Sequence, residues 1–439
     1  MQQEKMKYLE NLVGKTPMLE LIFDYKGEER RIFVKNESYN LTGSIKDRMA
    51  FYTLKKAYEK NEIKKGAAIV EATSGNTGIA FSAMGAILGH PVIIYMPDWM
   101  SEERKSLIRS FGAKIVLVSR EEGGFLGSIE KTKEFAKNNP DTYLPSQFSN
   151  PYNSEAHYYG IGLEIVNEMK SLNLNIDGFV AGVGTGGTVM GIGQRIKENF
   201  PNVKISPLEP LNSPTLSTGY KVAKHRIEGI SDEFVPDLIK LDKLDDVVSV
   251  DDGDAIVMAQ KLAKCGLGVG ISSGANFIGA LMLQNKLGKD SVIVTVFPDD
   301  NKKYLSTDLM KSEKVKEDFS SLKENDNDFQ EKISTDEDER NKKINKNFED
   351  ALDLHLNAET DEEFQKAEED FSSFIKTYKD FPDKPPALEN LLTEASSYLV
   401  ASKFRVKRLV GYLTFADILG WKGIWQKQNT DVGKIDNIR

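Results

Sequence analysis

Four short turns rich in Gly, Ser and Thr hold the residues of this chain that could do chemistry. Lys46 follows a Gly-Ser pair, in NLTGSIKDR, and leads directly into a helix-like segment. The other three turns read TSGNT at 73–77, GTGGT at 184–188 and ISSG at 271–274. A lysine held at such a turn can form a Schiff base with an aldehyde. We interpret the four turns as one site for a phosphorylated cofactor that carries an aldehyde.

The turn at 184–188 has the composition of a phosphate-binding loop. Its successive backbone N–H groups can point at one anion, and its glycines let the backbone approach that anion closely. Thr185 and Thr188 add hydroxyl donors. Glycine-rich turns often only close a strand–helix packing, but this one follows the apolar run 178–182 and opens a helix-like segment. That context favours phosphate binding.

The turn at 73–77 suits a carboxylate. It offers hydroxyls, backbone amides and the start of a helix, which together favour an anion. Asn76 could also bond a phenolic oxygen of the cofactor. Alternatively, this turn only caps a helix and binds no ligand, and Lys46 is an ordinary surface lysine. The presence of all four turns in one chain favours a cofactor-binding site over these alternatives.

The elements that position these turns are predicted from hydrophobic runs. The first 310 residues alternate short β-branched runs with amphipathic stretches, as βαβ units do. Strands are predicted at 68–70, 92–96, 114–118, 178–182, 203–209 and 292–297. Buried runs of this kind favour parallel sheets covered by helices, and ligands bind such α/β folds at the carboxyl ends of the strands. The predicted fold class is therefore α/β.

Composition limits the class of protein further. A chain of 439 residues, 40% hydrophobic and 28% charged, is typical of two or three globular domains. A net charge of −9 without a basic aromatic cluster argues against nucleic acid and membranes as partners. The single cysteine, Cys265, excludes an internal disulfide, and four histidines without ligand spacing argue against a metal site. With no apolar leader or membrane-length run, we expect a cytoplasmic protein.

Composition changes after Leu309. Residues 311–345 are mostly charged and polar, which predicts a solvated linker. Helical periodicity returns in residues 346–439, without a catalytic signature. We therefore expect a catalytic core at 1–310, with a smaller subdomain at about 47–150, a charged linker at 311–345 and a helical appendage of unknown role at 346–439.

The first 310 residues resemble the cysteine synthase (O-acetylserine sulfhydrylase) family of fold-type II pyridoxal-phosphate enzymes. The matching motifs, in order, are VGKTP at 13–17, MSEER at 100–104, FGA at 111–113, QFSNP at 147–151 and YLST at 304–307. The resemblance implies a tryptophan synthase β-like fold, in which pyridoxal 5'-phosphate lies between two α/β subdomains. It also implies a small amino-acid substrate and a homodimer.

The resemblance also assigns roles to residues. Lys46 would hold the aldehyde of the cofactor, and Asn76 its phenolic oxygen. The phosphate would be bound by Gly184, Thr185, Gly186, Gly187 and Thr188, and the pyridine nitrogen would lie near Ser272. The substrate carboxylate would be bound by Thr73, Ser74, Asn76, Thr77 and Gln147. A neutral serine beside the pyridine nitrogen does not hold the ring protonated, so loss of a β-substituent is favoured. Lys46 would then remove the Cα proton, which leads to an α-aminoacrylate.

The loop at 231–233 departs from the family. It reads Ser231-Asp232-Glu233 where relatives have glycine and alanine at the mouth of the site. Sulfide attacks without help, whereas water needs a base, and Asp232 is placed to be that base. Glu233 is the weaker candidate because strand-like alternation would turn it outward. Alternatively, Asp232 is a solvated loop acid or binds the ammonium of a second amino acid.

The predicted reaction is elimination of sulfide from L-cysteine followed by addition of water, which gives L-serine and hydrogen sulfide. Synthesis of cysteine from O-acetylserine and sulfide uses the same core motifs and is the first alternative. A second thiol amino acid as nucleophile would instead give lanthionine or cystathionine. A non-catalytic binding scaffold is the alternative from another class, and an intact Lys46 argues against it. The core motifs leave the nucleophile open.

Overall fold

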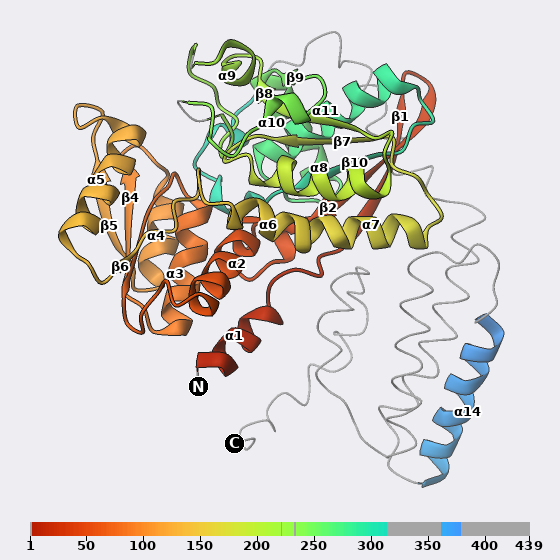
Figure 1. Cartoon of the computed structure of the whole chain (residues 1–439). Helices are drawn as coiled ribbons and strands as arrows, with labels where there is room; N and C mark the ends of the chain where they lie inside the picture. Colours follow the sequence, from red (N-terminus) through yellow and green to blue (C-terminus); the bar gives the residue numbers. More distant parts are fainter. Residues whose placement is uncertain (1, 221, 232–233, 314–360, 379–439) are drawn as a thin grey trace. The chain divides into compact units, whose positions relative to one another are not determined.

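The computed structural model of the chain separates into two compact units, 1–325 and 326–439. It describes residues 2–220, 222–231, 234–313 and 361–378 (Figure 1). In the second unit the described part is helix α14 (Asp361–Tyr378), in which Phe371 and Phe374 are buried three residues apart on one face. The predictions for the linker after residue 313 and for most of the appendage lie outside the described residues.

Two sheets organise the described part of the first unit. The larger sheet has the order β1-β2-β10-β7-β8-β9. Its strands are β1 (Met18–Tyr25), β2 (Glu28–Asn36), β7 (Gly178–Gly182), β8 (Lys204–Pro210), β9 (Val248–Val250) and β10 (Ile293–Phe297). All neighbours are parallel except β1 and β2, which form a hairpin. The hairpin closes at Lys26-Gly27, both with positive φ, as a tight two-residue turn requires.

The smaller sheet is entirely parallel, in the order β5-β4-β3-β6. Its strands are β3 (Ala68–Ala72), β4 (Val92–Pro97), β5 (Lys114–Val118) and β6 (Thr142–Tyr143). The helices between or before these strands are α2 (Lys46–Glu59), α3 (Asn76–Leu88), α4 (Glu102–Ser110) and α5 (Gly124–Asn138). Figure 1 shows them in red to orange around the small sheet. Helix α3 is apolar and nearly wholly buried, so it forms the centre of the hydrophobic core around the smaller sheet.

Helices cover both faces of the larger sheet. These are α6 (Tyr152–Tyr159), α7 (Ile161–Ser171), α8 (Gly187–Asn199), α10 (Asp252–Lys264) and α11 (Ile271–Leu287). Adjacent residues of β7 show the two faces: Phe179 packs in a core with α7 and α8, and Val180 packs in a core with α10 and α11. The short helices are α1 (Gln2–Glu10), α9 (Thr215–Thr218), η1 (Glu37–Tyr39), η2 (Leu241–Lys243), η3 (Asn301–Lys303) and η4 (Asp308–Met310).

The predicted α/β class is confirmed. The six predicted strands are present as β3, β4, β5, β7, β8 and β10, with ends that differ by at most two residues. Strands β1, β2, β6 and β9 were not predicted, since the hairpin carries many charges and the other two are only two and three residues long. Within the described residues, no helix has the length and apolar character needed to cross a membrane. The subdomain boundary near residue 150 and the homodimer stay predictions.

Candidate active site

One pocket lies at the carboxyl ends of strands from both sheets. The residues that follow β3, β7 and β10 line it, as do Ile45 before α2 and Ser272 in the first turn of α11. Helices α2, α3, α8 and α11 all begin at this pocket, with Lys46, Asn76, Gly187 and Ile271 as their first residues. Helix N-termini attract anions, so the pocket suits a negatively charged ligand. The four turns singled out in the sequence therefore meet in space.

Most predicted site residues line this pocket. They are Lys46, Thr73, Ser74, Asn76, Thr77, Gln147, Gly184, Thr185, Gly186, Thr188 and Ser272. Gly187 lies within the same turn but is not a lining residue. Asp232 lies outside the described residues, although Gly229 and Ile230 of its loop line the pocket. The chemical roles of all these residues stay predictions.

The backbone before Lys46 is fixed by the larger sheet and by Asp47. The Ile45 N–H donates to the Pro298 carbonyl at 2.8 Å. The Asp47 carboxylate accepts from the Thr42 N–H at 2.6 Å and the Thr42 hydroxyl at 2.7 Å. Burial raises the pKa of Asp47 to about 6, although these hydrogen bonds favour its ionised form. These hydrogen bonds fix the backbone of the turn that carries Lys46.

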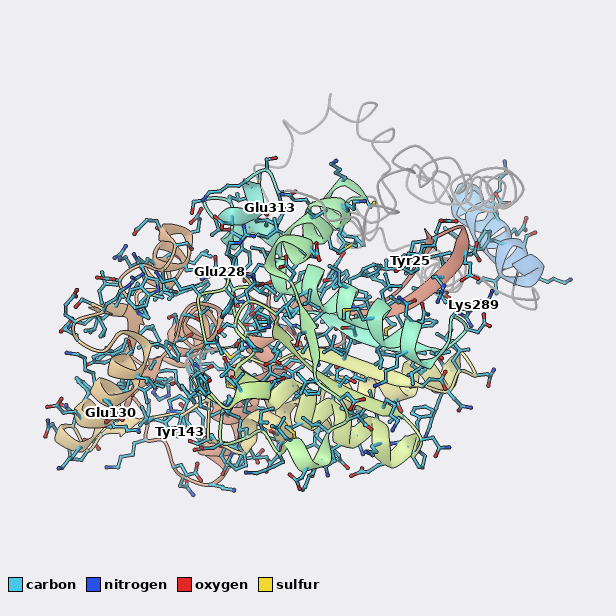
Figure 2. All side chains as sticks on the ribbon, turned by 90° about the horizontal axis from the view of Figure 1, so that it is seen from above. Tyr25, Glu130, Tyr143, Glu228, Lys289 and Glu313 are labelled. Carbon is cyan, nitrogen blue, oxygen red and sulfur yellow. The ribbon has the colours of Figure 1, made fainter. Side chains whose placement is uncertain are left out.

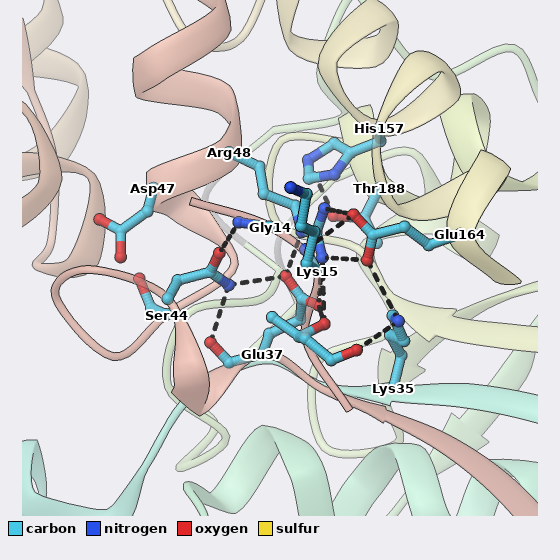
Figure 3. Close-up of polar contacts among 12 residues, drawn as sticks. Gly14, Lys15, Lys35, Glu37, Ser44, Asp47, Arg48, His157, Glu164 and Thr188 are labelled. Carbon is cyan, nitrogen blue, oxygen red and sulfur yellow. Dashed lines mark hydrogen bonds and ion pairs between the residues drawn. The ribbon is translucent and has the colours of Figure 1, made fainter. Parts of the chain in front are cut away.

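A buried charge network holds the first turn of α2 (Figure 3). Arg48 bonds Glu37 from Nε at 2.5 Å and Nη2 at 3.0 Å, and it bonds Glu164 from Nη1 at 2.7 Å. Lys35 Nζ lies 3.1 Å from Glu164 as well. Burial alone would raise the pKa of Glu164, but Arg48 and Lys35 outweigh it and lower the pKa to about 2. The network therefore ties α2, two residues after Lys46, to β2, η1 and α7.

The turn at 184–188 forms a cradle that requires glycine at 184, 186 and 187. A Cβ on Gly187 would lie 2.0 Å from Asn153 Oδ1, and one on Gly184 would lie 2.5 Å from the Gly229 carbonyl oxygen. Gly186 has φ +86°. The first amides of α8 have no backbone acceptor within the helix, and the Gly187 N–H makes only a long bond to Thr185 Oγ1 at 3.4 Å, so these amides can bond an anion in the pocket. This arrangement fits a phosphate group.

Asn76 offers a polar group in the same pocket. Its Nδ2 donates to Asp299 Oδ2 at 2.7 Å. Its Oδ1 is buried and has no hydrogen-bond partner among the described residues. A buried polar atom without a partner is costly unless a ligand satisfies it. Because Oδ1 is an acceptor, it fits a ligand group that donates an O–H or N–H, such as a hydroxyl.

The loop at 73–77 is held by Gln147. The Thr77 hydroxyl donates to Gln147 Oε1 at 2.7 Å, and Gln147 Nε2 donates to the Ala72 carbonyl at 2.8 Å. Behind it, Glu71 accepts from the Gln147 N–H at 3.2 Å, and burial raises the pKa of Glu71 to about 8. The loop is thus fixed before a ligand binds, at the N-terminus of α3.

Sequence reasoning missed a polar chain at the pocket, made of Glu228, Arg104, Tyr304 and Asp299. Arg104 forms an ion pair with Glu228, which is labelled in Figure 2, and its guanidinium lies 4.8 Å from the Tyr304 ring centroid. The Tyr304 hydroxyl donates to Asp299, the partner of Asn76. Arg104 and Tyr304 lay in the motifs MSEER and YLST, but a linear motif does not show which of its side chains reach a pocket.

The chain matches known proteins over the first unit. Residues 9–299 match the family described as "Pyridoxal-phosphate dependent enzyme". Cysteine synthase B of Campylobacter jejuni is 43% identical over 298 residues, 68% of this chain and 96% of that protein. A solved structure of a hydrogen sulfide-producing enzyme from Fusobacterium nucleatum is 95% identical, with a TM-score of 0.72, and the match covers 73% of this chain and 96% of that chain.

A second structure of that Fusobacterium enzyme has equal identity, coverage and TM-score. It is the D232N variant, lysine-dimethylated and in complex with an α-aminoacrylate intermediate. The α/β fold with two sheets is that of fold-type II pyridoxal-phosphate enzymes. Together with the matched residues, it identifies the chain as a member of the cysteine synthase family of pyridoxal-phosphate dependent enzymes.

Proposed function

We propose that this enzyme converts L-cysteine and water into L-serine and hydrogen sulfide. The observation that carries the proposal is the 95% identity to the hydrogen sulfide-producing enzyme of Fusobacterium nucleatum. The aspartate at position 232 supports the water-adding half. In the D232N structure of that neighbour an α-aminoacrylate intermediate is bound, as expected if this aspartate acts after the β-substituent has left.

The same proposal assigns a residue to each polar part of pyridoxal 5'-phosphate. Lys46 would hold the aldehyde carbon, residues 184–188 the phosphate, Asn76 the phenolic oxygen and Ser272 the ring nitrogen. When bound, the cofactor withdraws electrons from the amino acid and makes its Cα proton acidic. Because Ser272 is neutral, it would not keep the ring nitrogen protonated, which would favour loss of the β-substituent.

The protein's own groups then orient the substrate and move its protons. The carboxylate of cysteine would lie at the N-terminus of α3, against the hydroxyls and amides of 73–77, with Gln147 completing its site. Lys46 Nζ would take the Cα proton and, after the new bond forms, return it. Holding both groups in one pocket removes the need to bring them together at each turnover.

Asp232 would act in the second half of the reaction. Water is a weak nucleophile, so a carboxylate that takes its proton while the oxygen bonds the β-carbon accelerates the step. The loop supports this role because Glu228, Gly229 and Ile230 line the pocket, and Asp232 follows two residues later. Sulfide needs no such base, which separates this reaction from cysteine synthesis.

Product analysis tests the proposal. The holoenzyme is given L-cysteine alone, and serine and sulfide are quantified over time. We expect the two products in equal amounts, and sulfide release without serine would refute the addition of water.

Substitution of Asp232 tests the base. D232N should lower serine formation by about a hundredfold or more, the contribution typical of a general base. E233Q, the neighbouring carboxylate, is the matched control and should retain the rate. Serine formation by D232N at the wild-type rate would remove Asp232 from the mechanism.

Cysteine synthesis is the second candidate, and the 43% identity to cysteine synthase B of Campylobacter jejuni favours it. The same enzyme preparation is given O-acetylserine and sulfide. Faster formation of cysteine from these substrates than of serine from cysteine would make synthesis the preferred activity.

A further inference from the structure

We propose that Asp299 is the positioning residue for the amide of Asn76. Asp299 lies two residues after strand β10 and is fully buried. It is not among the residues that line the pocket, whereas Asn76 is, so it would act through Asn76. The inference rests on the proposed function, in which Asn76 bonds the phenolic oxygen of the cofactor.

The backbone of Asp299 is fixed by two of the turns at the pocket. It forms an antiparallel bridge with Ser44, two residues before Lys46. Its carbonyl also accepts from the Gly270 N–H at 3.2 Å, two residues before Ser272. Such backbone bonds are obligatory for buried groups, and here they hold Asp299 between the two turns. The side chain of Asp299 therefore starts from a defined position.

The carboxylate of Asp299 has room because residue 270 is glycine. A Cβ built on Gly270 would lie 2.3 Å from Asp299 Oδ1. The other oxygen, Oδ2, accepts from Asn76 Nδ2 at 2.7 Å and from the Tyr304 hydroxyl. Burial and the Asp299 carboxylate raise the pKa of Tyr304 well above its ordinary range, so this hydroxyl stays a donor. Asp299 therefore acts as an acceptor toward both neighbours.

This acceptor determines which way the Asn76 amide faces. An oxygen that only accepts cannot bond the amide oxygen of Asn76, so the NH2 group must face Asp299. Asn76 Oδ1 is then left as the buried atom without a partner among the described residues. A hydroxyl or amide in place of the carboxylate would allow both orientations of Asn76. Asp299 thus fixes one orientation of the amide that would meet the cofactor.

The orientation of this amide matters for the chemistry of the cofactor. Hydrogen bonds to the phenolic oxygen of pyridoxal 5'-phosphate change how strongly its ring withdraws electrons and which light it absorbs. An amide that turned over would exchange an acceptor for a donor at this oxygen. Held by Asp299, Asn76 would present the same atoms to every bound cofactor.

The test measures the binding and spectrum of the cofactor. The apoenzyme of each full-chain variant is titrated with pyridoxal 5'-phosphate, and the absorption spectrum of the bound cofactor is recorded. D299L keeps the branching of aspartate but removes the acceptor, so it should bind the cofactor about tenfold more weakly, the scale of one hydrogen bond to a charged group. Its spectrum should shift toward that of N76A. D299N keeps one oxygen that can accept from Asn76, so it should retain the wild-type spectrum, with affinity within about threefold.

A second pair of variants leaves Asp299 itself unchanged. G270A would place a Cβ against Asp299 Oδ1 and should reproduce part of the spectral shift. G268A is the matched control, because its Cβ would meet the end of the Asn301 side chain, 2.9 Å from Oδ1, instead of Asp299. It should keep the wild-type spectrum. If D299L fails to fold, the pair G270A and G268A decides the question.

The outcomes separate this inference from the proposed function. If N76A binds pyridoxal 5'-phosphate with wild-type affinity and spectrum, the proposed contact of Asn76 fails, and the inference on Asp299 fails with it. If N76A changes both but D299L and G270A keep the wild-type spectrum, only the inference on Asp299 is overturned. A further spectral shift in N76A/D299L relative to N76A would also overturn it, since Asp299 would then act by another route. None of these outcomes depends on the formation of serine.

Discussion

Replacing Glu37 with glutamine tests whether the buried network below Lys46 holds the active site together. The Glu37 side chain is fully buried and accepts from four donors. Thr16 Oγ1 and Arg48 Nη2 reach Oε1 at 2.6 and 3.0 Å, and Asn40 Nδ2 and Arg48 Nε reach Oε2 at 2.8 and 2.5 Å. In E37Q the new NH2 group must face an Arg48 N–H in either orientation.

The expected cost follows from that geometry. Removing one partner of a buried ion pair costs about 3–5 kcal/mol, because the other charge stays buried. Arg48 keeps its two bonds to Glu164, so we expect the lower end, about 3 kcal/mol. For a protein of this size, 1 kcal/mol corresponds to about 2 °C or somewhat more in melting temperature. E37Q should therefore melt about 6 °C below the wild type.

Thermal unfolding of the full chain with bound cofactor, followed by circular dichroism, measures this. E20Q is the control, because Glu20 forms an exposed ion pair with Arg31 at 3.4 Å, which is worth little. Cysteine turnover by E37Q should fall as well, since α2 begins at Lys46. If E37Q and E20Q melted within about 1 °C of each other, the assignment of the network as the support of α2 would be wrong.

Three further predictions concern residues in or directly behind the pocket. Burial raises the pKa of Glu71 from 4.5 to about 8, so between these pH values the folded state keeps a proton that the unfolded state has lost. The free energy of unfolding should therefore fall as pH rises across this window. Urea unfolding at pH 5 and pH 8 should show a smaller fall in E71Q than in the wild type. In G187A, the new Cβ would clash with Asn153 at 2.0 Å, so titration of the apoenzyme should show pyridoxal 5'-phosphate binding weakened about tenfold to a hundredfold. E228Q removes the ion pair with Arg104, and steady-state kinetics should show a KM for cysteine raised about threefold or more.

The parts of the fold predicted from sequence are those with local signals. Buried β-branched runs such as 92–96 and 178–182 indicate parallel strands, because such strands are apolar on both faces. The hairpin of β1 and β2 carries charges on its exposed face, so its strands have a weaker apolar signal. Its turn at Lys26-Gly27 was the local signal that could have revealed it.

The candidate site also has parts with a local sequence signal and parts without one. The four turns each carry a composition that indicates ligand binding, and they meet at one pocket. Arg104 and Glu228 are 124 positions apart, and nothing local to either residue indicates the other. Glu37 and Arg48 are closer in sequence, yet a buried ion pair depends on packing that brings both charges out of water. Contacts of this kind follow from the fold and not from a motif.

The described residues of the loop at 228–234 contact both halves of the core beside the pocket. Glu228 binds Arg104 of α4, Ser231 bonds Val183 after β7, and Phe234 packs on Phe148. Arg104 also lies 3.4 Å from the carbonyl of Ser74, in the loop proposed to bind the substrate carboxylate. The substrate carboxylate proposed to bind at 73–77 would therefore lie near Arg104, which forms an ion pair with Glu228 at the start of the loop. On the proposed function, the strand-end turns would determine which bond of the substrate breaks. The loop at 228–234 would determine which nucleophile then bonds the β-carbon.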